Sequence, residues 1–78
     1  GGFAVQVGAY GAHGNAERMA DQLRGAGHQG VELVSSSGRN GQPLTLVRVA
    51  GFDSLAQARS AAGAIGRSVG ANAIGVRR

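Results

Sequence analysis

The sequence has no cysteine, no tryptophan and a single proline, and only three of its 78 residues are aromatic. The lack of cysteine excludes disulfide bridges and thiolate metal sites, and it leaves the redox compartment open. No apolar segment approaches the roughly 20 residues that a membrane-spanning helix needs. Because aromatic side chains are so few, the hydrophobic core must consist of closely packed valine, leucine, isoleucine and alanine.

Lysine is absent as well, so all eight basic residues are arginines, and the formal net charge is +4. A net positive charge favours an anionic partner such as nucleic acid, an acidic lipid surface or a carboxylate-bearing polymer. The arginines are scattered along the chain, which argues against a surface that follows a phosphate backbone. A chain of this length lies near the lower limit for an unaided core. We expect residues 1–78 to form a single domain, taken from the C-terminus of a longer protein.

The sequence contains an internal repeat with a spacing of 42 residues. A shift of 42 positions aligns Val5-Gln6-Val7 with Val47-Arg48-Val49, and Tyr10 with Phe52. The same shift aligns residues 31–34 with residues 73–76. It also aligns two apolar stripes with the i, i+3, i+4, i+7 spacing of helices, Ala16, Met19, Ala20 and Leu23 with Ala58, Ala61, Ala62 and Ile65. Each half is therefore predicted to be strand, helix, strand.

Capping residues indicate where the two helices begin and end. Ser54 followed by Gln57 is a capping-box pattern for the second helix, and Asn15 is a suitable N-cap for the first. Glycines that follow each stripe supply left-handed C-caps, Gly25 and Gly27 for the first helix and Gly66 or Gly70 for the second.

The turn between the two halves completes the predicted topology. Asn40-Gly41 favours a hairpin, and Pro43 ends the turn before the next strand. The order is then β-α-β-β-α-β, the split βαβ arrangement of an α+β, ferredoxin-like fold, with two helices on one face of a four-stranded antiparallel sheet. The first and third strands are expected to be central. We predict strands near residues 3–9, 30–35, 44–50 and 72–77, and helices near residues 15–25 and 54–66.

The first strand, FAVQVGAY, carries a glutamine among apolar residues, and alternation shows where it points. Side chains of a strand alternate between faces, so Val5, Val7, Val47 and Val49 turn toward the helices. The outward positions are Ala4, Gln6 and Gly8 on the first strand and Leu44, Leu46 and Arg48 on the third. Gln6 and Arg48 are thus predicted to form a polar pair beside exposed leucines, as the floor of a shallow binding groove.

The acidic, histidine and serine residues of the chain do not form a pattern typical of a catalytic or metal site. Glu17 and Asp21 have the i, i+4 spacing of a solvated helix face. The two histidines are isolated, and the serines of residues 35–37 lie in a loop without a base, so neither a metal site nor a nucleophile is predicted. The glycine-rich residues 8–14 lack the spacing of a phosphate-binding loop. We predict no enzyme activity, cofactor or metal in this domain.

Two other functions are compatible with this topology. An RNA recognition motif has the same fold, and it binds single-stranded RNA by stacking bases on aromatic residues of its central strands. The outward positions of the central strands carry no aromatic residue here, so that stacking platform is missing. A ferredoxin-like regulatory or dimerisation domain is the other alternative, and the composition does not exclude it.

The order of a VQVG first strand, an A-x-x-L helix (NAERMADQL) and a V-R-V-x-G-F third strand, followed by SLAQARSAAGAI, resembles the SPOR (sporulation-related repeat) domain. The similarity covers essentially the whole chain. It implies a bacterial peptidoglycan-binding module that recognises glycan strands stripped of their stem peptides at the division septum. It also implies a periplasmic location in the cell envelope, and no contact of this domain with nucleic acid or membrane. We expect a monomer.

The resemblance also implies which residues bind the glycan. The glutamine of the family's glycan-contacting face matches Gln6, and the arginine of its sheet face matches Arg48. The hairpin before the third strand often delivers an aromatic residue to this face, and the position is Leu44 here. The expected glycan-binding set is Gln6, Gly8, Ala9, Tyr10, Leu44, Leu46, Arg48 and Asn72.

Overall fold

The computed structural model describes residues 1–78 as one sheet and two helices, in the order β1 (Phe3–Tyr10), α1 (His13–Gly25), β2 (Val31–Ser37), β3 (Pro43–Phe52), α2 (Leu55–Val69) and β4 (Ile74–Arg77). All strand pairs are antiparallel, and the strand order is β2-β3-β1-β4. The predicted β-α-β-β-α-β topology, with the first and third strands central, is confirmed. Neither helix is long and apolar enough to span a membrane.

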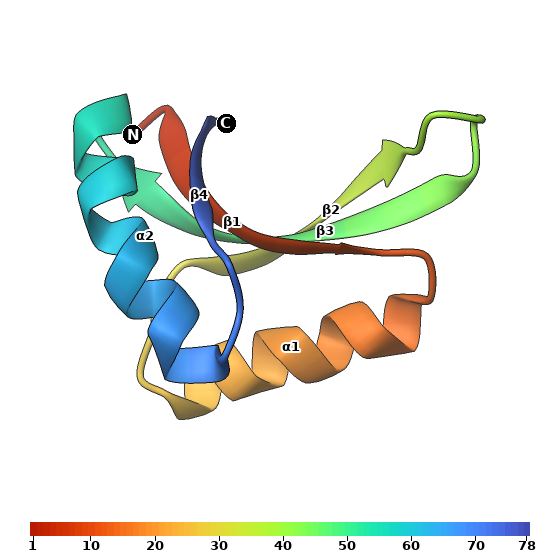
Figure 1. The fold of residues 1–78 in the computed structure, drawn as a ribbon, viewed down its shortest axis with the longest axis horizontal. Coiled ribbons are helices and arrows are strands. Elements are labelled where there is room, and N and C mark those ends of the chain that lie inside the picture. The colour runs from red at the N-terminus through yellow and green to blue at the C-terminus, as the bar shows by residue number, and fades with distance from the viewer.

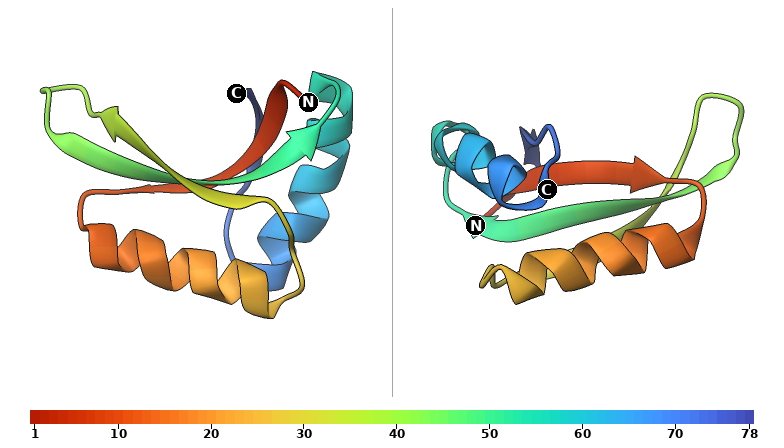
Figure 2. Two further views of the ribbon diagram at one scale, coloured as in Figure 1. Left: turned by 180° about the vertical axis from the view of Figure 1, so that it is seen from behind. Right: turned by 60° about the horizontal axis from the view of Figure 1, so that its bottom comes forward.

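One hydrophobic core joins the two helices to the same face of the sheet. It contains Val5, Val7, Val47 and Val49 from the central strands and three residues of each predicted helical stripe, Ala16, Ala20 and Leu23 with Ala58, Ala62 and Ile65. The fourth member of each stripe, Met19 and Ala61, is partly buried against this core. The small alanine side chains let the helices approach the sheet closely. Figures 1 and 2 show both helices on one side, while the other face of the sheet is left uncovered.

The ends of α2 follow the predicted signals. The Gln57 backbone N–H donates to Ser54 Oγ at 3.0 Å, and the Asp53 backbone N–H donates to Gln57 Oε1 at 3.0 Å. The first bond satisfies a backbone donor that the first turn of the helix leaves free, and the second ties the residue before the N-cap to the same turn. At the other end Gly70 adopts a left-handed φ of 69°, which ends the helix.

The start of α1 differs from the prediction. The helix begins at His13 with Ala12 as its N-cap, and no side chain caps it. His13 Nδ1 lies 3.2 Å from Thr45 Oγ1, so a contact with β3 holds the first turn two residues before Asn15. The Asn15 carboxamide instead accepts a hydrogen bond from the Arg18 guanidinium. Asn15 as N-cap is therefore wrong, because a tertiary contact replaces the local cap.

A β-bulge in β1 changes the faces of the residues that follow it. Gln6 pairs with Arg48 and Gly8 pairs with Val47, so Val7 is an extra residue in β1. Beyond the bulge Ala9 pairs with the outward Leu46, and Tyr10 packs against the core. The outward position predicted for Gly8 is wrong, because the bulge shifts the alternation by one residue.

The sheet is strongly twisted, and its curl shapes the uncovered face. In Figure 1 the β2–β3 hairpin rises on one side of this face, and the N-terminal end of α2 and both chain ends rise on the other. The hairpin itself turns where Asn40-Gly41 predicted: the Gly41 N–H donates to Gly38 O at 3.0 Å, and the Gly38 N–H donates to Gln42 O at 2.7 Å. The backbone of the sheet therefore curves toward its uncovered face.

Candidate functional site

A row of four side chains crosses the uncovered face from one edge of the sheet to the other. The cross-strand register sets Glu32 of β2 opposite Arg48 of β3, Arg48 opposite Gln6 of β1, and Gln6 opposite Ile74 of β4. Side chains directly opposite each other in a sheet lie on the same face within contact distance. The row therefore runs acid, base, amide and aliphatic side chain across the middle of the face.

Gln6 and Arg48 form the centre of this row. The Arg48 Nε–H donates to Gln6 Oε1 at 3.1 Å, and both residues are half-buried. The four N–H groups on the two terminal nitrogens of Arg48 and the amide NH₂ of Gln6 make no hydrogen bond within the protein. The predicted pair is thus formed, and it presents unused donors to a ligand.

The internal repeat generates the whole row. Gln6 and Arg48 are separated by 42 positions, which is the repeat spacing. Glu32 and Ile74 are repeat partners at the same spacing. An approximate two-fold axis therefore passes between Gln6 and Arg48, and the same relation places Glu32 and Ile74 at the two ends. Ile74 was missing from the predicted set, although its repeat relation to the second strand pointed to it.

Apolar side chains flank the row on the side of the hairpin. Leu46 pairs with Val34 on β2 and with Ala9 on β1, and Leu44 stands opposite Ser36. Leu46 is only 8% exposed, whereas Ile74 is 56% exposed and is the exposed large hydrophobic residue of the molecule. Leu44 is half-buried and Ala9 is exposed. The predicted residues Ala9, Leu44 and Leu46 thus share the face with Gln6 and Arg48, and Ile74 joins them.

An ion pair that the sequence did not reveal lies at the other side of the row. Arg78 Nε donates to Glu32 Oε1 at 3.1 Å, and Arg78 Nη2 donates to Glu32 Oε2 at 2.9 Å. The hydrogen bond from Arg78 holds the pKa of the Glu32 carboxyl below its ordinary value against the opposing effect of burial, and the charges of Arg78 and Arg48 lower it further. The same bond and the charge of Glu32 raise the pKa of Arg78.

Three residues of the predicted set do not reach this face. Gly8 and Tyr10 turn toward the helices beyond the bulge, and a Cβ on Gly8 would come within 2.9 Å of the Tyr10 ring. Asn72 is exposed in the connection between α2 and β4, which packs against Gly66 of α2. In Figure 1 this connection passes the end of α1, on the side of the sheet that the helices cover.

The other polar contacts do not form a catalytic or metal site. His28 Nε2 lies 2.9 Å from Ser68 Oγ, but that hydroxyl donates its proton to Ile65 O at 2.6 Å. His28 must then donate to Ser68 Oγ, so it cannot act as the base that activates this serine. No group of three or more histidine, cysteine, aspartate or glutamate side chains comes together.

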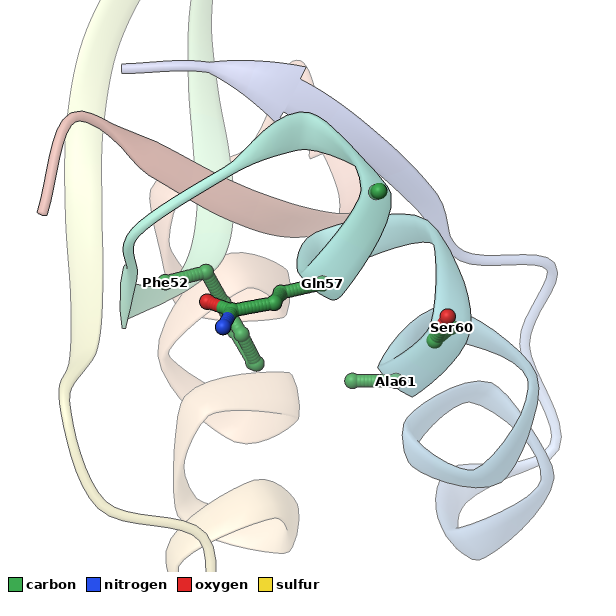
Figure 3. Close-up of a pocket in the computed structure, with 5 residues that line it drawn as sticks. Phe52, Gln57, Ser60 and Ala61 are labelled. Carbon is green, nitrogen blue, oxygen red and sulfur yellow. The ribbon is translucent and has the colours of Figure 1, made fainter.

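The hollows of the molecule lie beside α2, away from the Gln6–Arg48 pair, although Ile74 at the edge of the uncovered face lines the smaller one. The larger, about 570 Å³, is lined by Phe52, Ala56, Gln57, Ser60 and Ala61 at the start of α2 (Figure 3). Its main polar group, the Gln57 amide oxygen, is already bound to the Asp53 N–H. A smaller hollow of about 330 Å³ lies between α2 and β4. Neither brings together polar groups that would orient a ligand.

Comparisons with known proteins agree with this fold. The SPOR domain family model matches residues 1–74. The structure is similar to the crystal structure of the RlpA SPOR domain from Pseudomonas aeruginosa, with a TM-score of 0.78, 27% identity, and coverage of 99% of this chain and 100% of that chain. It is also similar in fold to the solution structure of the peptidoglycan-binding domain of the Bacillus subtilis cell wall lytic enzyme CwlC, with a TM-score of 0.67, 24% identity, and coverage of 97% and 87%. No curated protein sequence matches the chain.

Proposed function

The chain belongs to the SPOR domain family, and from this premise we propose that it is a non-catalytic module that binds peptidoglycan. Its proposed ligand is the polymer of N-acetylglucosamine and N-acetylmuramic acid without stem peptides, bound on the uncovered face of the sheet. The binding residues are Gln6, Ala9, Leu44, Leu46, Arg48 and Ile74. The observation that carries the proposal is the Gln6–Arg48 pair, which holds unused donors at the centre of that face.

Arg48 supplies the charge that the ligand requires. Removing the stem peptide frees the lactyl carboxylate of N-acetylmuramic acid, which the intact stem ties up as an amide. The terminal nitrogens of Arg48 can pair with this carboxylate in a bidentate, charge-assisted hydrogen bond. Gln6 both donates and accepts, so its amide suits an N-acetyl group or a pair of hydroxyls. An intact stem peptide would remove the carboxylate and collide with the sheet.

The apolar residues suit the C–H faces of the sugar rings. Leu44, toward the hairpin, and Ile74, next to Gln6 on β4, are accessible, whereas Leu46 is nearly covered. A pyranose ring that lies on an exposed aliphatic side chain removes apolar surface from water on both sides. No aromatic residue lies on this face, so aliphatic contacts replace ring stacking in the proposed complex.

The proposal extends to the cellular setting. Peptidoglycan is a component of the cell envelope, so the proposed location is periplasmic, at the division septum where denuded glycan accumulates. The parent protein is proposed to be a lytic transglycosylase of the rare lipoprotein A type, anchored as an outer-membrane lipoprotein, with this monomeric domain as its targeting module.

Sedimentation with purified sacculi tests the proposal. The domain is incubated with intact sacculi and with sacculi pretreated with an amidase that removes stem peptides. We expect much stronger retention after amidase treatment, and none on single-stranded RNA. The matched control is Arg48→Gln, which removes the charge and should reduce retention on the treated sacculi. Equal retention on both preparations would contradict selectivity for denuded glycan, and retention on RNA alone would support the RNA-binding alternative.

A further inference from the structure

The ion pair between Glu32 and Arg78 lies beside the proposed carboxylate-binding group, and the register shows why this matters. Glu32 stands directly opposite Arg48 on the neighbouring strand. An acid and a base in this position normally pair with each other. Here the two Glu32 oxygens bind Arg78 instead, at 3.1 and 2.9 Å, and Arg48 binds Gln6. Glu32 therefore has two competing cationic partners on the same face.

Arg78 reaches Glu32 by crossing the uncovered face. Its backbone N–H donates to Gly2 O at 2.8 Å, which continues the β4–β1 ladder, while Glu32 lies on the opposite edge strand. The register places the Ala4–Ala50 pair between these two positions. Ala4 has its side chain on this face yet is fully buried. Alanine at both positions leaves room for a long side chain to pass over the central strands.

From this arrangement we propose that Arg78 is a positioning residue: it occupies the carboxylate of Glu32 and so keeps the guanidinium of Arg48 free for the carboxylate of the ligand. The inference rests on the proposed function. The charges on the face support it. Glu32 and Arg78 neutralise each other, which leaves the positive charge of Arg48 for an anion. Without Arg78, the nearest cation to Glu32 would be Arg48, whose charge already lowers the pKa of the Glu32 carboxyl.

A set of substitutions that remove one or both charges of the pair tests this inference. The parent domain, Arg78→Gln, Glu32→Gln and the double variant are titrated with soluble glycan strands released by amidase digestion. A second probe is the same strands with their carboxylates reduced to alcohols. We expect Arg78→Gln to weaken binding of the carboxylate strands roughly tenfold, because Arg48 would then pair with Glu32 and lose its charge-assisted hydrogen bond to the ligand. Arg78→Gln should leave binding of the reduced strands nearly unchanged. Adding Glu32→Gln should restore the affinity for the carboxylate strands.

A second readout needs no ligand and separates this inference from the proposed function. The Arg48 Nε–H signal in a ¹⁵N–¹H NMR spectrum should move in Arg78→Gln, as Arg48 turns from Gln6 to Glu32, and should return in the double variant. If the parent domain binds neither strand, the proposed function is wrong, and this signal alone decides the role of Arg78. An unmoved signal would overturn the inference. So would a loss of binding in Arg78→Gln that is equal for both strands and is not restored by Glu32→Gln.

Discussion

The hydrogen bond between Arg48 and Gln6 fixes the orientation of both side chains before a ligand arrives. A single N–H of the guanidinium is used, so the remaining four and the Gln6 NH₂ stay available. Fixing two polar side chains in advance reduces the conformational entropy that binding must remove. In the proposed complex the pair would act as one recognition unit, so loss of either member should lower glycan affinity more than it lowers stability.

We predict that Gln6→Ala and Arg48→Ala each weaken binding of denuded glycan by about 1–3 kcal/mol, the value of a hydrogen bond to a polar or charged group. The free energy of unfolding should fall by only about 1 kcal/mol, because each change removes one half-buried hydrogen bond. Titration calorimetry and urea denaturation measure the two effects. If both folded variants bind as tightly as the parent, the uncovered face is not the binding site.

Val49→Ala is the matched control, because Val49 neighbours Arg48 in sequence but faces the helices. Its side chain is 4% exposed and belongs to the core. Deleting two buried methyl groups and leaving a cavity should cost roughly 2 kcal/mol of stability. The folded fraction should bind glycan normally. This variant therefore separates loss of fold from loss of contact.

The pH dependence of stability should report the Glu32–Arg78 pair. Because the folded pKa of the Glu32 carboxyl lies below its ordinary value of 4.5, the pair stabilises the fold fully above that pH. The contribution is lost as the pH falls through the folded pKa. Urea denaturation of the parent and Glu32→Gln should thus show a difference at pH 7 that shrinks as the pH is lowered below 4.5 and vanishes once the folded Glu32 carboxyl is protonated. As a control, Asp21→Asn, which removes an exposed ion pair with Arg24 at 3.4 Å, should change the free energy of unfolding little at pH 7.

At the scale of single elements, two glycines in α2 have opposite surroundings. A Cβ on Gly66 would lie 2.4 Å from the backbone oxygen of Ala71, so the connection to β4 would have to move. A Cβ on Gly63 would meet only the mobile end of the Arg67 side chain, at 3.1 Å. Gly66 thus makes the close passage of the connection possible, whereas Gly63 gains nothing from lacking a side chain.

We predict that Gly63→Ala raises the free energy of unfolding by about 0.5–1 kcal/mol, which is the usual gain for this change inside a helix. Gly66→Ala should lower it, because the clash with backbone outweighs the same gain in propensity. Thermal melts of the two variants against the parent measure both effects. A Gly66→Ala protein more stable than the parent would show that the connection shifts freely.

The elements themselves were largely predictable from the sequence, since local signals determine them. The apolar stripes gave both helices, and Ser54 and Gly70 fixed the ends of α2. The bulge at Val7 was not predictable, because Val7 continues the apolar alternation and only the pairing with β3 shows it to be extra. Unbroken alternation therefore placed Gly8 on the outward face, whereas the bulge turns it toward the helices. The predicted N-cap of α1 was wrong for a similar reason, because a tertiary contact between His13 and β3 replaces the local cap.

At the scale of the whole molecule, the repeat explains why the Gln6–Arg48 pair was predictable, whereas the Glu32–Arg78 pair was not. Repeat-related positions on adjacent strands meet at the two-fold axis, so Gln6 and Arg48 followed from the sequence. Arg78 lies 46 positions from Glu32, which is not the repeat spacing. Its contact depends on the curl of the sheet (Figure 1), and no periodicity in the sequence encodes that curl.

The distribution of charge over the molecule predicts how binding should respond to salt. Arg48 and Arg78 belong to the uncovered face, and Arg78 is neutralised by Glu32, so one free cation remains there. The other arginines lie on the helices, on the hairpin, or over the Phe3 ring in the case of Arg77. One ionic contact releases few counterions, so glycan affinity should fall only about threefold between 50 and 200 mM salt. Titrations at these concentrations test this, with Arg48→Gln as the control that should lose even this dependence. A fall of a hundredfold or more would mean that many arginines contact the ligand, which is the behaviour of a protein that follows a phosphate backbone.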